Sequence, residues 1–145
     1  MTTEGSIGIK KLDRDAKLVE KANQGDLGYD IFANENVAIN PGKSELIDTG
    51  VALQPPQGWG FFIKDRSSYA SSKNLETAAG VIDQGYRGEV KVLIRNYENR
   101  PHRVLRGDKI AQLVPISATS FDIQEVSQFN ETQRGADGFG STGEK

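Results

Sequence analysis

The sequence has no cysteine and a single histidine, His102, among its 145 residues. Without cysteine the chain can form neither a disulfide nor a Cys-ligated zinc site, and it has no cysteine nucleophile. One histidine excludes multi-histidine metal sites. We expect His102, between Pro101 and Arg103, to be a surface loop residue without a functional role. The remaining chemistry is that of oxygen ligands and of Arg and Lys, in a reducing compartment that we take to be cytoplasmic.

Long apolar runs and an excess of one charge are missing as well. No run approaches the roughly 20 residues of a membrane span, and the N-terminus lacks the order of a secretory signal. Lys and Arg number 18 against 20 Asp and Glu, so the net charge is −2, and no global basic field attracts polyanions. We therefore expect neither a membrane nor a nucleic acid as a partner.

Apolar residues are few, at 36%, whereas glycine is abundant, with 16 residues. The length provides for one domain. A domain of this size buries only about two-thirds of its unfolded surface. We therefore expect partner subunits to complete the core.

Short apolar segments alternate with Pro and Gly turn signals, which is typical of an all-β barrel or sandwich. The expected strands lie within Ser6–Leu12, Val37–Asn40, Glu45–Leu53, Gly60–Lys64, Val90–Arg95 and Ile110–Ser117. In Val90–Arg95 the alternation breaks at Leu93 and Ile94, which is typical of a strand covered on both faces.

Two segments have helical character. Leu12–Ala22 has apolar residues at helical spacing, and propensity alone leaves helix and non-helix equally open there. Ser67–Asn74 predicts one short helix, with Ser67 or Ser68 as the N-cap. The polar, Gly-rich end predicts a flexible C-terminal arm at residues 127–145, after a β-domain at residues 1–126.

Five segments carry residues that an ordinary β-domain does not need: Gly25–Ala33, Asp65–Ala70, Gly80–Val90, Gly107–Val114 and Arg134–Gly143.

Two of the segments offer specific chemistry, each with a plainer alternative. Arg66, Ser67 and Ser68 at a helix start can bind one anion, or they are an N-cap beside a surface arginine. Asp83, next to the turn signal Gln84–Gly85, can act as a general base on water from beside a hairpin tip, or it caps the turn.

The arm segment combines a cation, an aromatic ring and glycines whose N–H groups can approach a ligand closely. Arg134 supplies the charge, Ser141 and Thr142 add donors, and Phe139 can stack on a flat ring. The alternative is a solvated, structureless terminus. An exposed phenylalanine favours a ligand that covers it.

Asp30 and Gln112 are weaker signals. Asp30 can hold a metal through water or cap a turn, and Gln112, inside the apolar run of Ile110–Val114, must find a partner in the protein or in a ligand.

Together and in this order, the five segments resemble the five motifs of the trimeric dUTPases, from about Ile7 to Gly143. GVIDQGYRGEV, GDKIAQLV and RGADGFGSTG match closely. The resemblance implies a jelly-roll-like β-barrel with one short helix, a homotrimer, and active sites between subunits. It also implies a strand followed by a loop, rather than a helix, in Leu12–Ala22. The implied activity is the hydrolysis of dUTP to dUMP and pyrophosphate.

The resemblance also implies roles in base and sugar recognition and in catalysis. Asp83 resembles the carboxylate that activates water for attack on the α-phosphorus. Gly80 and Ile82 belong to the segment that resembles the uracil pocket. Tyr86 resembles the ring that packs under deoxyribose and excludes a 2′-hydroxyl.

For the triphosphate, Arg66, Ser67 and Gln112 resemble phosphate ligands, and Ser68 belongs to the same segment. Asp30 resembles the acidic residue near the waters of Mg²⁺, which the triphosphate itself mostly holds.

In the arm, Arg134 resembles the cation on the terminal phosphates, and Phe139 resembles the ring over uracil. Gly140, Ser141 and Thr142 belong to the same motif, and the two hydroxyls are expected to donate to phosphate.

Three positions depart from the family pattern. Gln84–Gly85 replaces a pair that often includes an acid. Asp65 precedes Arg66 where Gly or Pro is common, so that it either repels phosphate or pairs with Arg66. Thr77 stands where some relatives use Asn to read uracil.

Two other functions stay open. A dCTP deaminase shares the fold but lacks the Asp83–Tyr86 pattern. A nucleotide-binding regulator without activity would not need every catalytic position filled, as it is here.

Overall fold

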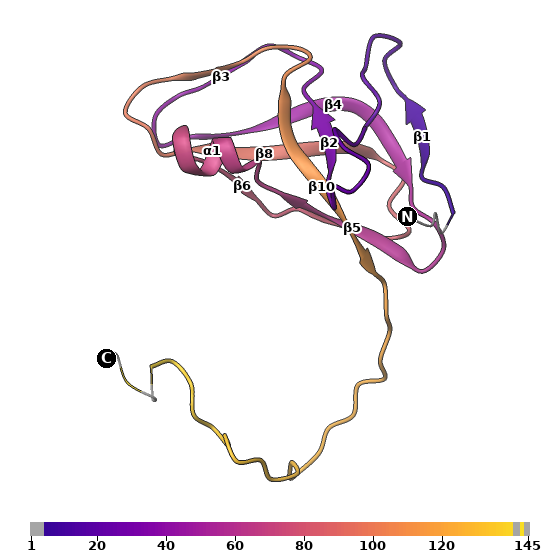
Figure 1. Cartoon of the computed structure of the whole chain (residues 1–145), viewed down its shortest axis with the longest axis vertical. Helices are drawn as coiled ribbons and strands as arrows, with labels where there is room; N and C mark the ends of the chain where they lie inside the picture. The colour runs from indigo at the N-terminus through magenta and orange to yellow at the C-terminus, as the bar shows by residue number, and fades with distance from the viewer. Residues whose placement is uncertain (1–4, 141–142, 144–145) are drawn as a thin grey trace.

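The computed structural model describes residues 5–140 and residue 143. One short helix and ten strands run through this part of the chain (Figure 1). In chain order they are β1 (Gly8–Lys11), β2 (Tyr29–Phe32), β3 (Val37–Ile39), β4 (Ser44–Gln54), β5 (Trp59–Lys64), α1 (Ser67–Ser72), β6 (Leu75–Ala78), β7 (Val81–Ile82), β8 (Glu89–Asn96), β9 (His102–Val104) and β10 (Lys109–Ser117). Within these residues, no helix is long and apolar enough to cross a membrane.

Two four-stranded sheets, with the orders β1-β4-β8-β6 and β2-β10-β5-β7, form the body, and β3 pairs with β9 beside them. Neighbouring strands run antiparallel. All six expected strand segments contain a strand, and the prediction of a mostly β fold with one short helix is confirmed. The sequence did not predict the other four strands, β2, β6, β7 and β9, which have two to four residues each.

Side chains of both sheets share one core. Ile47, Val92 and Ile94 of one sheet are fully buried, as are Phe61 and Leu113 of the other. Full burial of such a side chain stabilises the fold by about 1.5–3 kcal/mol. The alternating burial along β8 shows that only one of its faces points into this core.

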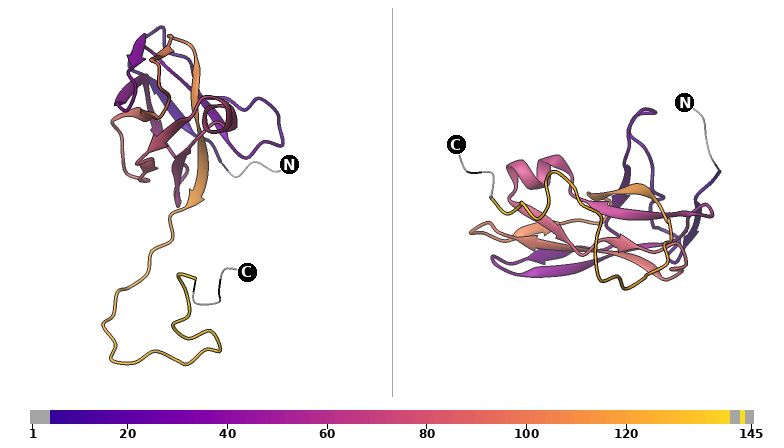
Figure 2. Two further views of the ribbon diagram at one scale, coloured as in Figure 1. Left: turned by 90° about the vertical axis from the view of Figure 1, so that its left-hand side faces the viewer. Right: turned by 90° about the horizontal axis from the view of Figure 1, so that it is seen from below.

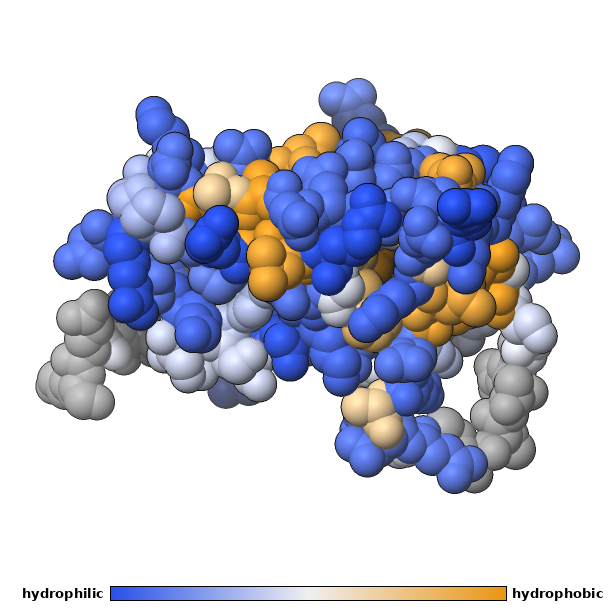
Figure 3. Space-filling model, turned by 90° about the horizontal axis from the view of Figure 1, so that it is seen from above, coloured by the Kyte–Doolittle hydropathy of each residue, from blue (hydrophilic) through white to orange (hydrophobic). Residues whose placement is uncertain are grey.

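The outer face of the β4–β8 pair is open in the single chain. Leu46 and Leu93 are direct partners across the two strands, so they share a face. Leu46 is 53% exposed and Leu93 is half-buried. The sequence predicted that both faces of β8 are covered, but the chain itself covers only one of them. Figure 3 shows hydrophobic patches in an otherwise hydrophilic surface on the face seen from above.

The segment Leu12–Ala22 contains no helix, as the family resemblance implied, so its helical spacing is misleading. The strand that was also implied, β1, lies just before the segment. β1 ends at Lys11, and the Asp13 carboxylate accepts the N–H of Asp15 at 2.9 Å, which favours a turn. Ala16 is buried, beside the site of Gly50 in β4. Tertiary contacts thus override helix propensity here.

The helix α1 differs in two respects from the prediction. It ends at Ser72 rather than at residue 74, and the N-cap is Arg66, without a side-chain capping bond. Neither Ser67 nor Ser68 is therefore the N-cap, because both already have helical backbone. Asn74, with a φ of 49°, follows the helix in the left-handed conformation that commonly ends helices.

The last strand ends at Ser117, and residues 118–140 contain neither helix nor strand. Figures 1 and 2 show this segment leaving the body and extending beyond it. Phe121, Ile123, Phe129 and Phe139 are all more than 80% exposed along it. These apolar side chains have no cover within the chain.

Candidate active site

A pocket of about 290 Å³ lies beside the turn after β7, and we call it the turn pocket. Its volume is near the lower end of the roughly 300–1,000 Å³ of small-molecule sites. Its lining comprises Leu46, Ile63, Ala79, Gly80, Val81, Ile82, Asp83, Tyr86, Glu89, Val90 and Lys91. The pocket therefore brings together four expected site residues, Gly80, Ile82, Asp83 and Tyr86.

Two glycines allow β7 to lie close against β5. Ile63 donates its N–H to the Gly80 carbonyl at 2.7 Å. A Cβ on Gly80 would lie 2.8 Å from the Ile63 carbonyl oxygen, and Gly80 has a φ of 96°. A Cβ on Gly60 would likewise lie 2.8 Å from the Ile82 carbonyl oxygen. Larger residues would push this backbone outward, and with it Asp83.

The turn itself is closed by backbone bonds. The N–H of Tyr86 donates to the Asp83 carbonyl at 3.1 Å, and the Arg87 guanidinium donates to the Gln84 carbonyl at 2.6 Å. The expected hairpin is wrong, however, because β7 pairs with β5 whereas β8 pairs with β4 and β6. The turn instead carries the chain from one sheet to the other.

Tyr86 and Asp83 border this pocket differently. The Tyr86 hydroxyl donates to the Glu89 carbonyl at 2.7 Å, and a Cβ on Gly88 would overlap the Tyr86 ring, so the ring is held in one place. Asp83 is exposed. No described residue donates a hydrogen bond to its carboxylate, which faces solvent at the pocket.

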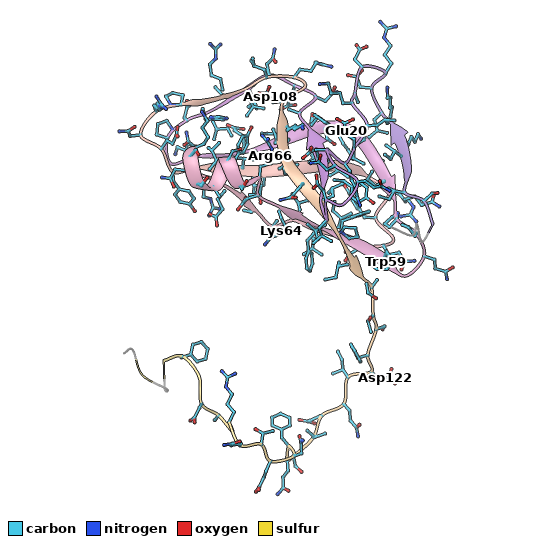
Figure 4. The ribbon with its side chains drawn as sticks, in the orientation of Figure 1. Glu20, Trp59, Lys64, Arg66, Asp108 and Asp122 are labelled. Carbon is cyan, nitrogen blue, oxygen red and sulfur yellow. The ribbon has the colours of Figure 1, made fainter. Side chains whose placement is uncertain are left out.

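A second group of polar residues surrounds β10, and we call it the β10 polar cluster: Asp30, Asp65, Arg66, Lys109 and Gln112. Lys109 Nζ lies 3.1 Å from Asp30 Oδ2. The Arg66 guanidinium donates to the Lys109 carbonyl at 3.3 Å and lies 5.7 Å from the centre of the Tyr69 ring. Figure 4 labels Arg66, which lies between α1 and β10.

Gln112 finds its partner in the protein. Its side-chain Nε2 donates to the Asp65 carbonyl at 2.9 Å. Gly28 makes room for this side chain, because a Cβ there would overlap Gln112 Oε1 and lie 2.9 Å from Cδ. The sequence segment of Gly28 and the segment of Gln112 are thus in direct contact.

Asp65 does not pair with Arg66. Its carboxylate accepts the N–H of Thr77 at 2.5 Å, and no ion pair joins Asp65 to Arg66 within the described part of the chain. Ser67 and Ser68, next to Arg66, are exposed at the start of α1.

His102 is not a loop residue, as expected, but the first residue of β9, and it is half-buried. Its ring meets the Tyr69 ring edge-on at 5.6 Å. Burial lowers the pKa of His102, and Lys73 adds to this, whereas Glu98 and Asp108 oppose it. Burial also raises the pKa of the Tyr69 hydroxyl. The proline and the arginine that flank His102 suggested a loop, whereas the chain forms the three-residue strand β9 there.

The third group of expected residues lies on the arm, outside the body. Arg134 Nε donates to the Asp137 carbonyl at 2.8 Å in a local turn. Phe139 and Gly140 both have positive φ. Ser141 and Thr142 lie outside the described residues.

In the single chain, the turn pocket, the β10 polar cluster and the arm residues do not form one site. The turn pocket contains Asp83 but neither Arg66 nor Gln112 nor an arm residue. In Figure 4, Asp122, in the segment that leads to the arm, lies outside the body that contains Arg66.

Sequence reasoning assigned no site role to the other seven residues of the pocket wall, which include Leu46, Glu89 and Lys91. Lys91 forms an ion pair with Asp48 at 3.0 Å, and Glu89 accepts the N–H of Gly50 at 2.9 Å. In sequence, Glu89 and Lys91 match the polar positions of an ordinary alternating strand, so no local signal distinguishes them.

A metal would find no ready-made protein cage in the described residues, since no three acidic or histidine side chains there gather around one point. Mg²⁺ does not require one, because it usually keeps several waters and binds one or two carboxylates plus substrate phosphates. Asp30, whose side chain is 18% exposed, fits that limited role.

The body is β-rich and holds a pocket of small-molecule size with an exposed carboxylate, and it carries separate cations and hydroxyls of the kind that bind phosphate. The family model described as dUTPase matches residues 14–143. The chain therefore belongs to the dUTPase family.

Curated relatives agree with this assignment. The chain is 41% identical to the deoxyuridine 5'-triphosphate nucleotidohydrolase of Clostridium tetani, over 97% of this chain and 99% of that protein. It is 39% identical to the protein of the same name from Corynebacterium glutamicum, over 99% and 98%.

Solved structures are similar over nearly the whole chain. A mutant dUTPase of Staphylococcus bacteriophage 80alpha, solved with dUpNHpp, has a TM-score of 0.88 and 28% identity, over 97% of this chain and 99% of that one. A mutant dUTPase from phage phi11 of S. aureus, described as coordinating a structural Mg(II) ion, has a TM-score of 0.82 and 25% identity, over 88% and 100%.

Proposed function

We propose that this protein hydrolyses dUTP to dUMP and pyrophosphate, which limits uracil incorporation into DNA and supplies dUMP for dTTP synthesis. The observation that carries the proposal is the turn pocket, in which the exposed Asp83 carboxylate adjoins an apolar cavity of nucleoside size. The names of the relatives identify the same substrate.

In this mechanism Asp83 is the general base. Its carboxylate takes a proton from a water molecule, and the water oxygen attacks the α-phosphorus, so that pyrophosphate leaves. The carboxylate is exposed at the pocket, where water can reach it. A positioned base contributes roughly 10²–10⁴-fold to such a step.

The turn pocket selects the nucleoside. The backbone at Gly80 and Ile82 borders the cavity and offers groups that read the edge of uracil. Tyr86, held by the Glu89 carbonyl, would clash with a 2′-hydroxyl. Such a clash discriminates more strongly than the loss of a methylene, which is worth about 1–3 kcal/mol, because a closed pocket cannot relax around it.

The β10 polar cluster and the arm bind the triphosphate, which carries about four negative charges with Mg²⁺ as its counter-ion. Arg66 and Arg134 offset charge, while Ser67, Ser68 and Gln112 donate hydrogen bonds. Mg²⁺, when bound, stabilises the charge of the leaving pyrophosphate. Asp30 would hold it through water.

The active site is proposed to form between subunits of a homotrimer. No residue of the β10 polar cluster lines the turn pocket of the same chain, so in this proposal a second copy supplies the cluster for each pocket. The open face at Leu46 and Leu93, and the bare apolar side chains of the arm, offer surfaces for this contact. A soluble protein rarely leaves such groups uncovered.

The arm would then close over the bound nucleotide. Phe139, which is 114% exposed, is expected to stack on uracil. Gly140, Ser141 and Thr142 are expected to donate to phosphate. Closure excludes water other than the attacking one and aligns the α-phosphorus with it.

The direct test is pyrophosphate release from dUTP, dCTP, dTTP and UTP, measured side by side with Mg²⁺. We expect fast release from dUTP alone. Ammonia released from dCTP instead of pyrophosphate from dUTP would identify a deaminase. Equal rates with UTP and dUTP would contradict the proposed role of Tyr86.

A further inference from the structure

Asp65 lies at a junction between the two sheets. It follows the last residue of β5 and precedes Arg66, the N-cap of α1. Its side chain is half-buried. A carboxylate one residue from an anion-binding segment would repel phosphate unless another group held it elsewhere.

The partner of that carboxylate is the open edge of the other sheet. β6 is the outer strand of its sheet, and Thr77 lies opposite Ile94 of β8. Tyr97 donates its N–H to the Asn74 carbonyl at 3.1 Å. Because hydrogen-bonded pairs alternate along antiparallel strands, the N–H of Thr77 points away from β8. The Asp65 carboxylate accepts this N–H at 2.5 Å, where a further strand would otherwise bind.

The backbone of Asp65 has a second function. Its carbonyl accepts Gln112 Nε2 at 2.9 Å, so the peptide that the carboxylate anchors also orients the Gln112 amide. One N–H of that amide is used in this bond, and the other is left for a ligand. The next residue, Arg66, is bound to the Lys109 carbonyl instead of to Asp65, so Asp65 does not neutralise its charge.

We infer that Asp65 is a positioning residue for the triphosphate, an inference that rests on the proposed function. By anchoring β5 to the edge of β6, its carboxylate fixes the peptide that presents Gln112 and starts α1 at Arg66. It acts through these residues, and its own charge is directed away from the phosphates.

The experiment compares two ligands on the full-length protein. The analogue dUpNHpp with Mg²⁺ requires the phosphate ligands, whereas deoxyuridine reaches only the turn pocket. We expect Asp65→Ala to weaken dUpNHpp binding about tenfold, a typical effect of losing a hydrogen bond to a charged group, and to leave deoxyuridine binding within about twofold. Asp65→Asn should restore most of the affinity, because its amide oxygen can still accept the Thr77 N–H.

Two controls keep the test specific. Thr77→Pro removes the N–H but keeps Asp65, and an edge strand tolerates proline, so it should weaken dUpNHpp binding as well, even where Asp65→Ala folds poorly. Asp13→Ala removes a carboxylate that also accepts a backbone N–H, but in the loop after β1. It should leave the affinity for both ligands unchanged.

The outcomes separate this inference from the proposed function. If the unmodified protein hydrolyses dUTP and Asp65→Ala binds dUpNHpp equally well, the positioning role is overturned. An equal loss of both ligands would mean a purely structural role, and an Asp65→Asn variant as defective as Asp65→Ala would mean that charge, not anchoring, matters. If the unmodified protein neither binds dUpNHpp nor releases pyrophosphate, the proposed function fails, and the inference fails with it.

Discussion

The turn pocket and the β10 polar cluster are built on opposite principles. In the pocket, apolar side chains and backbone form most of the wall, to which Glu89 and Lys91 also contribute, and the one proposed catalytic group, Asp83, has no hydrogen-bond donor among the described residues. In the cluster, the polar groups are joined to one another: Lys109 to Asp30, Arg66 to the Lys109 carbonyl, and Gln112 to the Asp65 carbonyl.

This difference indicates a division of labour. Under the proposed function, the exposed Asp83 carboxylate acts as the base, and the cavity selects the nucleoside by fit. Preorganised donors and cations stabilise charge without reorganising when the ligand arrives. Changes in the pocket should therefore affect turnover and selectivity, and changes in the cluster should affect the affinity for the triphosphate.

The largest effect should come from Asp83→Asn. The amide keeps the shape and hydrogen-bonding capacity of the side chain but cannot accept the proton, so turnover should fall by roughly 10²–10⁴. Affinity for dUTP should survive, because the removed charge lies near an anionic substrate. Pyrophosphate release and equilibrium binding measure the two quantities. Asp15→Asn, on an exposed loop, controls for charge alone, and an Asp83→Asn variant with nearly full turnover would refute the base assignment.

Removal of the chain from Arg134 onward should have the next largest effect. The cut removes a cation, two hydroxyls and the Phe139 ring, so kcat should fall at least about tenfold, which corresponds to ~1.4 kcal/mol. The fold should survive, because the residues described beyond 134 contribute no strand or buried core residue. Thermal unfolding and pyrophosphate release measure both.

The same variant can test whether the arm reaches another subunit. If the protein forms the proposed homotrimer, mixed trimers of truncated chains and Asp83→Asn chains should regain activity, since one chain then supplies the base and the other the arm. Failure to complement after verified subunit exchange would mean that the arm closes over its own subunit's site.

The sequence predicted the pocket better than the cluster. Asp83 and Tyr86 are three residues apart, and Gly80 and Ile82 adjoin them, so local turn chemistry brings these side chains together. The bond between Gln112 and Asp65 joins residues 47 positions apart, and no local pattern specifies such a contact.

Local propensity failed where tertiary contacts competed with it. Leu12–Ala22 has helical spacing, but Ala16 is buried beside Gly50 of β4. The hairpin expected at Gln84–Gly85 is a turn between sheets, because strand pairing depends on partners distant in the sequence. By contrast, the long apolar segments became strands, since burial of one face determines their conformation.

Gly28→Ala should have a smaller effect, confined to the cluster. The new Cβ would overlap Gln112 Oε1, and the flexible amide would rotate away from the Asp65 carbonyl. We expect about tenfold weaker binding of dUpNHpp, typical of one lost bond to a charged group, with little change in deoxyuridine binding. Gly25→Ala is the matched control, because a Cβ there has nothing within 4 Å. Equal effects of the two variants would contradict the packing of Gly28 against Gln112.

The smallest effect should be on the pH dependence of stability, and it should arise from His102. His102 packs against Tyr69, the ring beside the Arg66 guanidinium, and no histidine adjoins Asp83. Burial lowers the pKa of His102 from its ordinary value of 6.5, so the unfolded chain binds more protons than the folded one. The stability that the neutral imidazole contributes is therefore complete above that ordinary value and is lost as the pH falls through the lower folded-state pKa.

His102→Gln removes this titration while retaining a polar side chain. The loss of the free energy of unfolding between about pH 7.5 and about pH 5.5 should therefore be smaller in the variant than in the unmodified protein. Urea unfolding at both pH values measures it, and the carboxylates, present in both proteins, cancel in the comparison. An equal or steeper loss in His102→Gln would mean that the protonated imidazole is accommodated beside Tyr69, and that the cluster side of the molecule tolerates a further cation next to Arg66.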